Sequence, residues 1–489
     1  MKFLNQTLLD IRDQIQGGKT RSVDVVTESL ERIKKYDKDI NAFITMNDVA
    51  MKRAEEIDTR IKKGEKVGRL AGVPIAVKDM YCTKGLKTTA ASKILNNFIP
   101  QYSATVVQKL EKEGAVIVGK TNCDEFAMGS SNENSAYGVV QNPWRKGHVA
   151  GGSSGGAAAA QAARYVFGSM GTDTGGSIRQ PASLCGLYGI KPTYGRVSRY
   201  GIIAYASSLD QAGPLASSTK DAAEILTSIA GFDEMDSTSS AEAVPDFAKD
   251  INPDMTKVTI GIPKEYFGED LNPEIKSVVL NAIEILKSQG AKFKEISLPH
   301  TKFAVPVYYL VATSEASSNL SRYDGIRYGL RVPSQDLNEL YSQTRSDGFG
   351  TEVKKRIMLG TFALSSGYYD AYYKKASQVR RIILNDFLKA FTGCDAIICP
   401  VTTSTAFKVG EKIKDTLSMY YNDIFTTSTN LAGLPGMSIP GGLSKDGLPI
   451  GIQIMAPHFK EQTIFNISQA LENNLKVDMK MKGGMVDGI

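Results

Sequence analysis

Histidine and cysteine are scarce in this chain of 489 residues. It has three histidines and five cysteines, and the cysteines are widely spaced, with no Cys-x-x-Cys pair. An odd number of separated cysteines argues against a disulfide framework and a structural zinc site, and it favours a reducing compartment. So few histidines weaken the case for a histidine-based metal site or catalytic triad. We therefore expect a cytoplasmic protein that holds no metal.

A strong charge of one sign and a long apolar segment are also lacking. The chain has 58 basic and 52 acidic residues, and the net charge of +6 permits contact with nucleic acid without arguing for it. The N-terminal segment is interrupted by Asn5, Gln6 and Asp10, which is not typical of a secretory signal. The uncharged run from Ile424 to Ser444 contains two prolines and several hydroxyl residues. It predicts a loop and a buried strand, and no association with a membrane.

The composition is that of an ordinary globular protein, with 42% hydrophobic and 22% charged residues, enough to build a sizeable core. Short apolar runs of strand length alternate with segments of helical periodicity. This alternation predicts an α/β fold with a mostly parallel or mixed central sheet covered by helices on both faces. The expected strands are 73–77, 115–118, 258–262, 396–399 and 450–454. The expected helices are 4–16, 23–36, 48–63, 103–113, 157–163, 274–288, 351–366, 369–392 and 461–473.

Local signals also suggest boundaries along the chain. Gly17 and Gly18 are expected to end the first helix, and Ser22 is expected to cap the second. We expect an N-terminal helical segment over 1–65 that packs on one large domain over 66–475, followed by a mobile tail over 476–489. Residues 232–256 are rich in Ser, Asp, Glu and Ala and include two prolines, which predicts a surface loop or a linker.

Residues Gly114 to Thr121 match the P-loop pattern letter for letter. A P-loop needs a strand before it and a flexible loop within it, so that backbone N–H groups can surround a phosphate. Here a predicted helix precedes the motif, and its four inner residues are apolar and typical of a strand. The segment therefore predicts a buried strand followed by a turn.

A second motif, Gly151 to Gly155, matches the nucleophile elbow of α/β-hydrolases, with Ser153 as the nucleophile. That interpretation requires a histidine downstream, but His300 and His458 each follow a proline in a loop-like segment. The same loop could instead bind an anion at the start of the next helix, or simply pack closely. None of these alternatives explains a second glycine-rich segment, Gly171 to Arg179.

The two glycine-rich loops each carry a serine, Ser153 and Ser177, and we expect the loops to converge on one site. Consecutive N–H groups from Thr174 to Ser177 can form a nest for a developing oxyanion. A serine nucleophile needs a base, and Lys78 ends an apolar strand, where lost hydration would depress its pKa. A neutral lysine could take a proton from one serine, which relays it from the other. Taken alone, Lys78 could equally be a solvated charge.

Three motifs taken together resemble the amidase signature family. They are GVPIAVKD around Lys78, AGGSSGG from Ala150 to Gly156, and GTDTGGSIRQPA from Gly171 to Ala182. The resemblance extends over roughly residues 20–475, and it implies a single large catalytic domain that performs acyl transfer on amides.

The same resemblance implies a role for each matching residue. Ser177 would be the nucleophile that forms the acyl-enzyme, Ser153 would be a bridging serine that follows a cis peptide bond, and Lys78 would be the base. The oxyanion hole would be formed by the backbone of Thr174, Gly175, Gly176 and Ser177.

Three further segments narrow the resemblance to the glutamine-hydrolysing subunits of tRNA-dependent amidotransferases within that family. They are Ser314 to Gly329, Lys355 to Tyr373 and Met419 to Gly442. The resemblance implies that Arg356 and Asp423 recognise the two ends of free glutamine, with Tyr308 as a less securely aligned third residue. A bidentate arginine suits the substrate carboxylate, and a carboxylate suits its ammonium. Without the resemblance, Arg356 and Asp423 would be read as members of ordinary surface ion pairs.

The resemblance also implies partners, the B and C subunits of a heterotrimeric amidotransferase. Ammonia from glutamine would pass to the B subunit, which uses ATP and Mg²⁺ to convert Glu-tRNA(Gln) to Gln-tRNA(Gln), and the small C subunit would complete the heterotrimer. This chain itself would hold no cofactor and would meet tRNA mainly through the B subunit, and Asp-tRNA(Asn) is a second possible acceptor.

Other functions stay open at this point. The alternatives are a stand-alone amidase for a small amide and a non-catalytic scaffold subunit. A group of tyrosines and lysines could stack on RNA, although at helical spacing they more often pack: Tyr368, Tyr369, Tyr372, Tyr373, Lys374 and Lys375.

Overall fold

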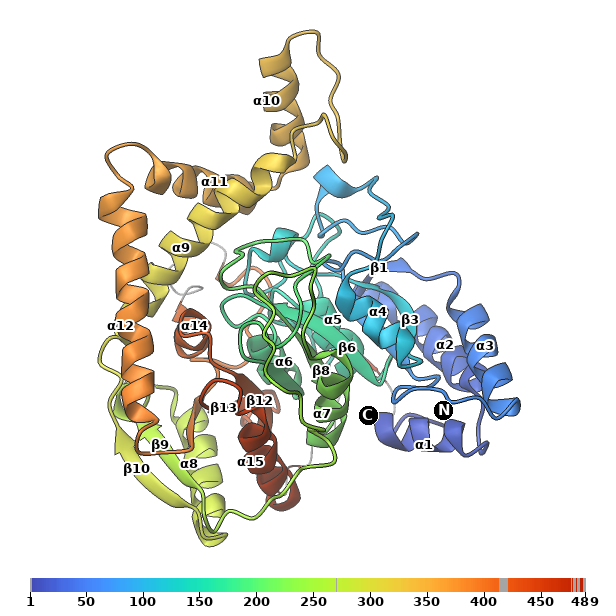
Figure 1. Ribbon diagram of the computed structural model, residues 1–489, viewed down its shortest axis with the longest axis vertical. Coiled ribbons are helices and arrows are strands. Elements are labelled where there is room, and N and C mark those ends of the chain that lie inside the picture. The colour runs from blue at the N-terminus through green and yellow to red at the C-terminus, as the bar shows by residue number, and fades with distance from the viewer. Residues whose placement is uncertain are drawn as a thin grey trace.

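Figure 1 shows the computed structural model, which describes residues 2–269, 271–412, 421–475, 477, 481 and 484–486. Its centre is a sheet of eleven strands in the order β1-β3-β2-β6-β8-β7-β12-β13-β11-β9-β10. The strands are β1 (Phe43–Met46), β2 (Pro74–Lys78), β3 (Val116–Thr121), β6 (Gly168–Asp173), β7 (Tyr188–Lys191), β8 (Gln211–Ala216), β9 (Thr259–Pro263), β10 (Lys292–Ile296), β11 (Ala396–Pro400), β12 (Gly436–Leu443) and β13 (Pro449–Met455). A separate hairpin pairs β4 (Gln141–Asn142) with β5 (Arg145–Val149).

The sheet is mixed, as expected, and its parallel pairs lie away from its centre. Strands β3, β2 and β6 run parallel on one side, and β11, β9 and β10 run parallel on the other. Between them β8, β7, β12 and β13 pair antiparallel. All five strands expected from apolar runs are present, with ends shifted by up to three residues.

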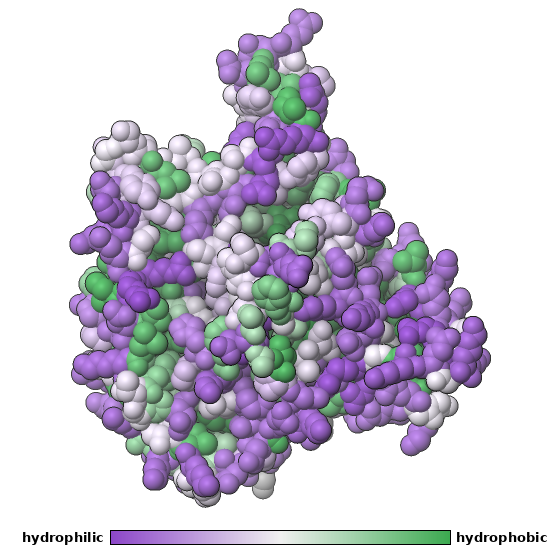
Figure 2. Space-filling model, in the orientation of Figure 1, coloured by the Kyte–Doolittle hydropathy of each residue, from purple (hydrophilic) through white to green (hydrophobic). Residues whose placement is uncertain are grey.

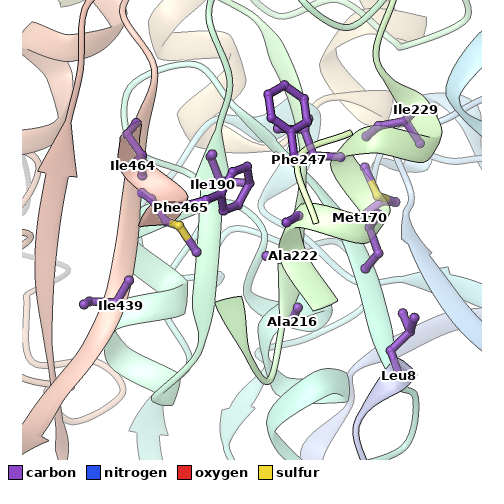
Figure 3. Packing of buried hydrophobic residues seen from close by; sticks show 14 of the residues in the cluster. Leu8, Met170, Ile190, Ala216, Ala222, Ile229, Phe247, Ile439, Ile464 and Phe465 are labelled. Carbon is purple, nitrogen blue, oxygen red and sulfur yellow. The ribbon is translucent and has the colours of Figure 1, made fainter. Parts of the chain in front are cut away.

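Helices cover both faces, because neighbouring residues of the strands alternate between two hydrophobic clusters. In β2, Ile75 and Val77 belong to the cluster shown in Figure 3, whereas Ala76 belongs to the cluster on the opposite face. In Figure 3, Phe465 and Ala222 come from helices that pack on the first face. The helices on that face are α1 (Leu8–Gln16), α4 (Thr105–Lys112), α7 (Thr219–Ile229), α8 (Pro273–Ser288) and α15 (Glu461–Asn474).

The other face carries two groups of helices. Near the N-terminal strands lie α2 (Ser22–Ile40), α3 (Ala50–Lys62), α5 (Gly155–Ala162) and α6 (Arg179–Cys185). The second group lies along the top and the left of Figure 1 and includes α10, which projects furthest from the sheet. Its members are α9 (Ala304–Asn319), α10 (Leu337–Gly348), α11 (Thr351–Leu364), the π-helix Asp370–Lys374, α12 (Lys375–Ala390) and α14 (Ile424–Leu431).

Two local predictions at the first helices have different outcomes. The expected end of α1 is confirmed, because the helix stops at Gln16 and Gly18 adopts a positive φ of 69°. The expected cap at Ser22 is wrong, because Ser22 is already the first residue of α2. The side chain of Asp58 accepts its N–H at 2.7 Å instead. This cap comes from α3 and is therefore set by tertiary packing.

The segment Ile424 to Ser444 also differs from the prediction of a loop and a strand. Its second half is β12, but Ile424–Leu431 is the buried helix α14. The hydroxyl of Thr427 donates to the Asp423 carbonyl oxygen at 2.7 Å, so a helix rich in threonine satisfies its own polar groups in the interior. Within the described residues no helix combines the length and apolarity needed to span a bilayer.

The structure describes parts of the three expected segments, 1–65, 66–475 and 476–489, but it does not test the division of the chain into them. Strand β1, from the segment 1–65, joins the central sheet beside β3. Residues 232–256 contain neither helix nor strand. Most of the tail expected over 476–489 lies outside the described residues. The boundaries at residues 65 and 475 therefore stay predictions.

Candidate active site

Lys78 is the last residue of β2, and its side chain is fully buried. Its Nζ lies within hydrogen-bond distance of three hydroxyl oxygens, Ser153 Oγ at 2.7 Å, Ser154 Oγ at 3.0 Å and Thr172 Oγ1 at 2.8 Å. Three acceptors match the three N–H bonds of a protonated amine. When Lys78 is neutral, its lone pair can accept a proton from one of these hydroxyls.

Burial also sets the proton affinity of Lys78. Loss of hydration lowers the pKa of Lys78 to about 8, and the nearby carboxylates of Asp124, Asp173 and Asp210 act in the opposite direction. With a pKa of about 8, roughly a tenth of the molecules hold a neutral lysine at pH 7. Because its side chain is fully buried, Lys78 is not the solvated charge that the sequence left open as an alternative. It can therefore act as a base near neutral pH.

Ser153 follows a cis peptide bond, Gly152–Ser153, as the family resemblance implies. Two contacts hold its loop on either side of this bond. The Gly152 N–H donates to Gln180 Oε1 at 3.0 Å, and the Asp124 N–H donates to the Ser153 carbonyl oxygen at 3.2 Å. The hydroxyl of Ser153 thereby faces the Lys78 amine from a fixed backbone.

Ser177 lies at the start of the turn that leads into α6, and only 8% of its surface is exposed. Its carbonyl oxygen accepts the Ser154 N–H at 3.3 Å, so the two glycine-rich loops do meet. The described hydrogen bonds join Lys78 to Ser153 but do not include one between the Ser153 and Ser177 hydroxyls. The proton relay between the two serines stays a prediction.

The loop expected to form the oxyanion hole is held by a buried ion pair. Asp173 accepts the Gly176 N–H at 2.8 Å and the Arg179 guanidinium at 3.0 Å, and both side chains are fully buried. Burial alone would raise the pKa of Asp173, but the Arg179 charge and hydrogen bonds outweigh it and lower the pKa to about 2. The carboxylate therefore stays ionised and fixes the loop at all working pH values.

This arrangement changes the expected set of oxyanion donors. The Gly176 N–H donates to Asp173, so it is engaged within the loop, and its expected part in the oxyanion hole stays a prediction. Within the described part of the chain, the N–H groups of Thr174, Gly175 and Ser177 have no hydrogen-bond acceptor. The Gly175 carbonyl oxygen, in turn, accepts the Thr426 hydroxyl at 2.7 Å. These three N–H groups are therefore free to serve as the donors expected for an oxyanion.

The residues expected to bind glutamine surround the same loop. The ring of Tyr308 lies so close to Gly175 that a Cβ there would be 2.8 Å from the tyrosine Cζ. Asp423 precedes α14 and accepts the Ser130 hydroxyl at 2.6 Å through Oδ2, while its Oδ1 is buried without a partner among the described residues. Burial raises the pKa of Asp423 to about 7. A buried carboxylate oxygen without a partner is a ready acceptor for a cationic ligand group.

Arg356 reaches into this region from α11 and is 4% exposed. Its Nη1 donates to Tyr205 Oη at 2.9 Å, and its Nε donates to Glu352 at 2.8 Å, an (i, i+4) pair within the helix. Arg356 therefore does form an ordinary ion pair, with Glu352, which was the alternative left open from the sequence. This ion pair uses only the Nε atom of the guanidinium. The Arg356 charge also acts to lower the pKa of Asp423, which places the two groups within electrostatic reach of each other.

The histidines do not support the hydrolase interpretation of Ser153. His300 Nδ1 contacts Asp386 at 3.0 Å, and His458 Nε2 contacts the Ala432 carbonyl oxygen at 3.0 Å. Ser153 instead contacts Lys78. In the described residues no three His, Cys, Asp or Glu side chains are grouped to hold a metal ion. The P-loop pattern is also structural, since its residues from Val116 form the buried strand β3, as predicted.

Several residues of this site were not singled out from the sequence. Asp173 and Arg179 lie inside the second glycine-rich motif, where their opposite charges were the available signal. Thr172 contacts the Lys78 amine, while Gln180 and Thr426 hold the two serine-bearing loops. Their neutral side chains carry no local signal, because each acts through a contact distant in sequence.

The comparisons with known proteins agree with this geometry. The Amidase family matches residues 24–465 of the chain. The chain is 58% identical over 471 residues to the glutamyl-tRNA(Gln) amidotransferase A subunit of Bdellovibrio bacteriovorus, covering 95% of this chain and 96% of that protein. The crystal structure of the glutamyl-tRNA(Gln) amidotransferase A subunit from Thermotoga maritima superposes with a TM-score of 0.79 at 41% identity, covering 93% and 92% of the two chains. Native peptide amidase from Stenotrophomonas maltophilia superposes with a TM-score of 0.83 at 29% identity, covering 97% and 98%. The chain belongs to the amidase family.

Proposed function

We propose that this chain is the glutamine-hydrolysing subunit of an amidotransferase that converts Glu-tRNA(Gln) to Gln-tRNA(Gln). The observation that carries the proposal is a buried Lys78 amine, with a pKa near 8, bonded to Ser153 beside a loop that presents N–H groups and Ser177. The 58% identity to the A subunit of a glutamyl-tRNA(Gln) amidotransferase supports the choice of glutamine and of the tRNA-linked pathway.

Acylation begins when the Ser177 oxygen attacks the side-chain amide carbon of glutamine. The Ser177 proton passes to the Ser153 oxygen as the Ser153 proton passes to Lys78 Nζ, which lies 2.7 Å away. The negative charge that forms on the amide oxygen is stabilised by N–H groups of Thr174, Gly175 and Ser177. Collapse of the tetrahedral intermediate breaks the carbon–nitrogen bond, and Lys78 returns its proton through Ser153 to the departing ammonia.

Deacylation uses the same groups with water as the nucleophile. Lys78 and Ser153 remove a proton from water, which attacks the glutamyl ester on Ser177 and releases glutamate. The Asp173–Arg179 pair takes no part in proton transfer. It acts as a positioning pair, because its hydrogen bonds hold the Gly176 N–H and the start of α6 in place for both steps.

Specificity for free glutamine is assigned to Arg356, Asp423 and Tyr308. The Arg356 Nη2, which binds neither Glu352 nor Tyr205, suits the substrate carboxylate, and the unpartnered Oδ1 of Asp423 suits its ammonium. Tyr308 packs against Gly175 and would keep the amide close to the oxyanion loop. A neutral amide lacks both charged ends and would leave these buried groups unpaired.

The remaining chemistry belongs to partner subunits. The B subunit would use ATP and Mg²⁺ to activate glutamyl-tRNA and would accept the ammonia, and the C subunit would complete the heterotrimer in the cytoplasm. This chain would meet tRNA mainly through the B subunit. The acceptor could also include Asp-tRNA(Asn), a choice that this chain's site does not make.

The likeness to a peptide amidase supports one rival, a stand-alone amidase acting on a small amide. The second rival is a non-catalytic scaffold. Arg356 and Asp423 argue against the first, and the contact between Lys78 and Ser153 argues against the second.

One experiment separates these functions. The purified chain is assayed for ammonia release from glutamine, alone and with the B and C subunits, and in parallel with an aryl amide. We expect weak glutaminase activity alone and faster activity with the partners, with transfer of ammonia to misacylated tRNA. Rapid aryl-amide hydrolysis with no action on glutamine would support the stand-alone amidase. The absence of a covalent adduct on Ser177 after treatment with an amide-directed acylating reagent would support the scaffold.

A further inference from the structure

Helix α11 has two distinct faces. The inner face, Val353, Arg356, Gly360 and Ala363, is buried against the rest of the molecule. The outer face carries three large apolar side chains at helical spacing, with exposed fractions of 73% for Met358, 48% for Leu359 and 49% for Phe362. A helix at the surface of a soluble protein normally presents polar residues outward, so an apolar outer stripe marks an interaction site.

The stripe continues into the π-helix Asp370–Lys374. The ring of Phe362 lies 4.5 Å from that of Tyr368 and 5.8 Å from that of Tyr372, between ring centroids. Tyr368 and Tyr372 are 44% and 36% exposed, so these tyrosines pack partly on Phe362, as expected from their spacing, and keep a large surface open to solvent. We call Met358, Leu359, Phe362, Tyr368 and Tyr372 the outer ridge. Figure 2 shows pale and green side chains gathered at the upper left, over the turn between α11 and α12.

The charges beside the outer ridge are mostly positive. Lys355 lies one helical turn before Met358, and Lys375 lies one turn after Tyr372; both are exposed. Neither forms an ion pair among the described residues, whereas Lys374 is paired with Asp370 at 3.0 Å. A partner that covers the ridge would meet an unpaired lysine at each end, which favours carboxylates at the matching positions.

We propose that the outer ridge is the docking site for an amphipathic segment of a partner subunit, with an apolar stripe bordered by acidic side chains. The proposal rests on the proposed function, because it assigns the partner to the amidotransferase assembly. Aromatic rings and a methionine surrounded by a charged rim are the typical core of a protein interface. A π-helical turn within the ridge is also a frequent feature of functional sites.

The position of the outer ridge links partner binding to glutamine binding. The inner face of α11 fits so closely on α9 that a Cβ on Gly360 would overlap the Thr313 carbonyl oxygen. Helix α9 carries Tyr308, and α11 carries Arg356. A segment docked on the outside of α11 would therefore hold two of the three glutamine-binding residues in place. We expect partner docking to lower KM for glutamine more than it raises kcat.

Two other occupants are less compatible with the outer ridge. A second copy of this chain, related by two-fold symmetry, would bring the lysines of one ridge against those of the other. Single-stranded RNA would stack on the tyrosines, but Met358 and Leu359, at the Lys355 end of the ridge, provide no stacking surface. Both occupants remain outcomes of the test.

The test compares two matched double variants of the full chain. Met358→Ser/Phe362→Ser removes two of the apolar side chains that α11 contributes to the outer ridge. Met235→Ser/Phe232→Ser makes the same change at a methionine and a phenylalanine that are 61% and 57% exposed elsewhere. Each variant is titrated with the B and C subunits, and glutaminase activity is measured alone and in the complex.

We expect the ridge variant to bind the partners at least about 30-fold more weakly, to keep basal glutaminase within about twofold, and to lose the partner-dependent fall in KM. The control variant should behave as wild type. Lys355→Glu should weaken partner binding without altering basal activity. Wild-type assembly and activation of the ridge variant would overturn the proposal.

Two further readouts identify a wrong occupant. A concentration-dependent dimer of the wild-type chain that the ridge variant loses would assign the ridge to a second copy. Loss of tRNA binding with unchanged subunit assembly would assign it to RNA. The two proposals also fail separately: an absence of glutaminase activity in every sample removes the proposed function, while ridge-dependent assembly would still support the docking site.

Discussion

The proposed catalytic groups and the proposed glutamine-binding groups occupy two regions that are built differently. Lys78 ends β2, and Thr172 and Asp173 are the last two residues of the neighbouring strand β6. The Lys78 amine lies 2.8 Å from the Thr172 hydroxyl, and all three side chains are buried. Arg356 and Tyr308 lie on α11 and α9, in a helical layer whose outer side is apolar and exposed. In the proposed mechanism the chemistry is thus fixed by the core of the fold, whereas substrate recognition depends on a helical layer with an exposed outer side.

The largest effect should come from the rigid region. We expect Lys78→Met to lower kcat/KM for glutamine by about 10³-fold or more, because the variant loses the amine that is proposed to accept the proton from Ser153. Methionine has a similar length and needs no hydration, so the fold should persist. Ammonia release and circular dichroism measure the two consequences. An active Lys78→Met enzyme would remove the lysine from the mechanism.

A methyl group in the oxyanion loop should have the next largest effect. In Gly175→Ala the new Cβ would lie 2.8 Å from the Tyr308 ring, and in Gly176→Ala it would overlap the Thr426 hydroxyl at a residue whose φ is 140°. Moving the loop misplaces its N–H donors, and loss of one such donor costs about 10²- to 10³-fold in kcat. Gly268→Ala is the matched control, since a Cβ there meets no atom within 4 Å. Equal kcat values for all three variants would show that the loop is not the oxyanion site.

The sequence predicts the strand-based region better than the helical layer, and the reason is the difference in how the two regions are built. Apolar runs such as Val73 to Val77 indicated buried strands, and the glycine-rich loops indicated where Ser153 and Ser177 lie. The use of the Gly176 N–H by Asp173 could not be predicted, because it depends on the exact turn of the loop. Helix α14 was also missed, because its threonines suggest a loop unless their burial is known.

Tertiary contacts account for the other gaps. The cap of α2 comes from Asp58, 36 positions along the chain, and the order of the sheet places four antiparallel strands at its centre. Local periodicity contains no information on such pairings. The exposure of the outer ridge was likewise hidden, since aromatic residues at helical spacing usually indicate packing.

A change in the helical layer should alter binding more than chemistry. We expect Arg356→Met to raise KM for glutamine by about 10²-fold with a smaller change in kcat, because the substrate carboxylate loses its charged partner. The variant also frees Tyr205 and Glu352, which Arg356 now contacts. Arg345→Met is the control variant, because it removes an arginine from α10 in the same helical layer. A fall in kcat alone would place Arg356 with the catalytic groups and weaken the contrast between the regions.

The smallest expected effect is a separation of two pH dependences, one for each region. Burial lowers the pKa of Lys78 to about 8, so kcat should rise by up to about tenfold from pH 7 as the lysine loses its proton. Burial raises the pKa of Asp423 to about 7, so below that pH the carboxyl becomes neutral and its hold on the substrate ammonium weakens. KM for glutamine should therefore increase as the pH falls from 7 to 6, by less than about tenfold.

Asp423→Asn tests the assignment of the second dependence. The variant should have a high KM that no longer changes between pH 6 and 8, while its kcat should keep the rise through about pH 8 that belongs to Lys78. A neutral amide substrate serves as the control, because it has no ammonium and its KM should be independent of pH for either enzyme. If the Asn variant instead lost the rise in kcat, the carboxylate and the amine would titrate as one coupled unit, and the division between a catalytic core and a recognition layer would not hold.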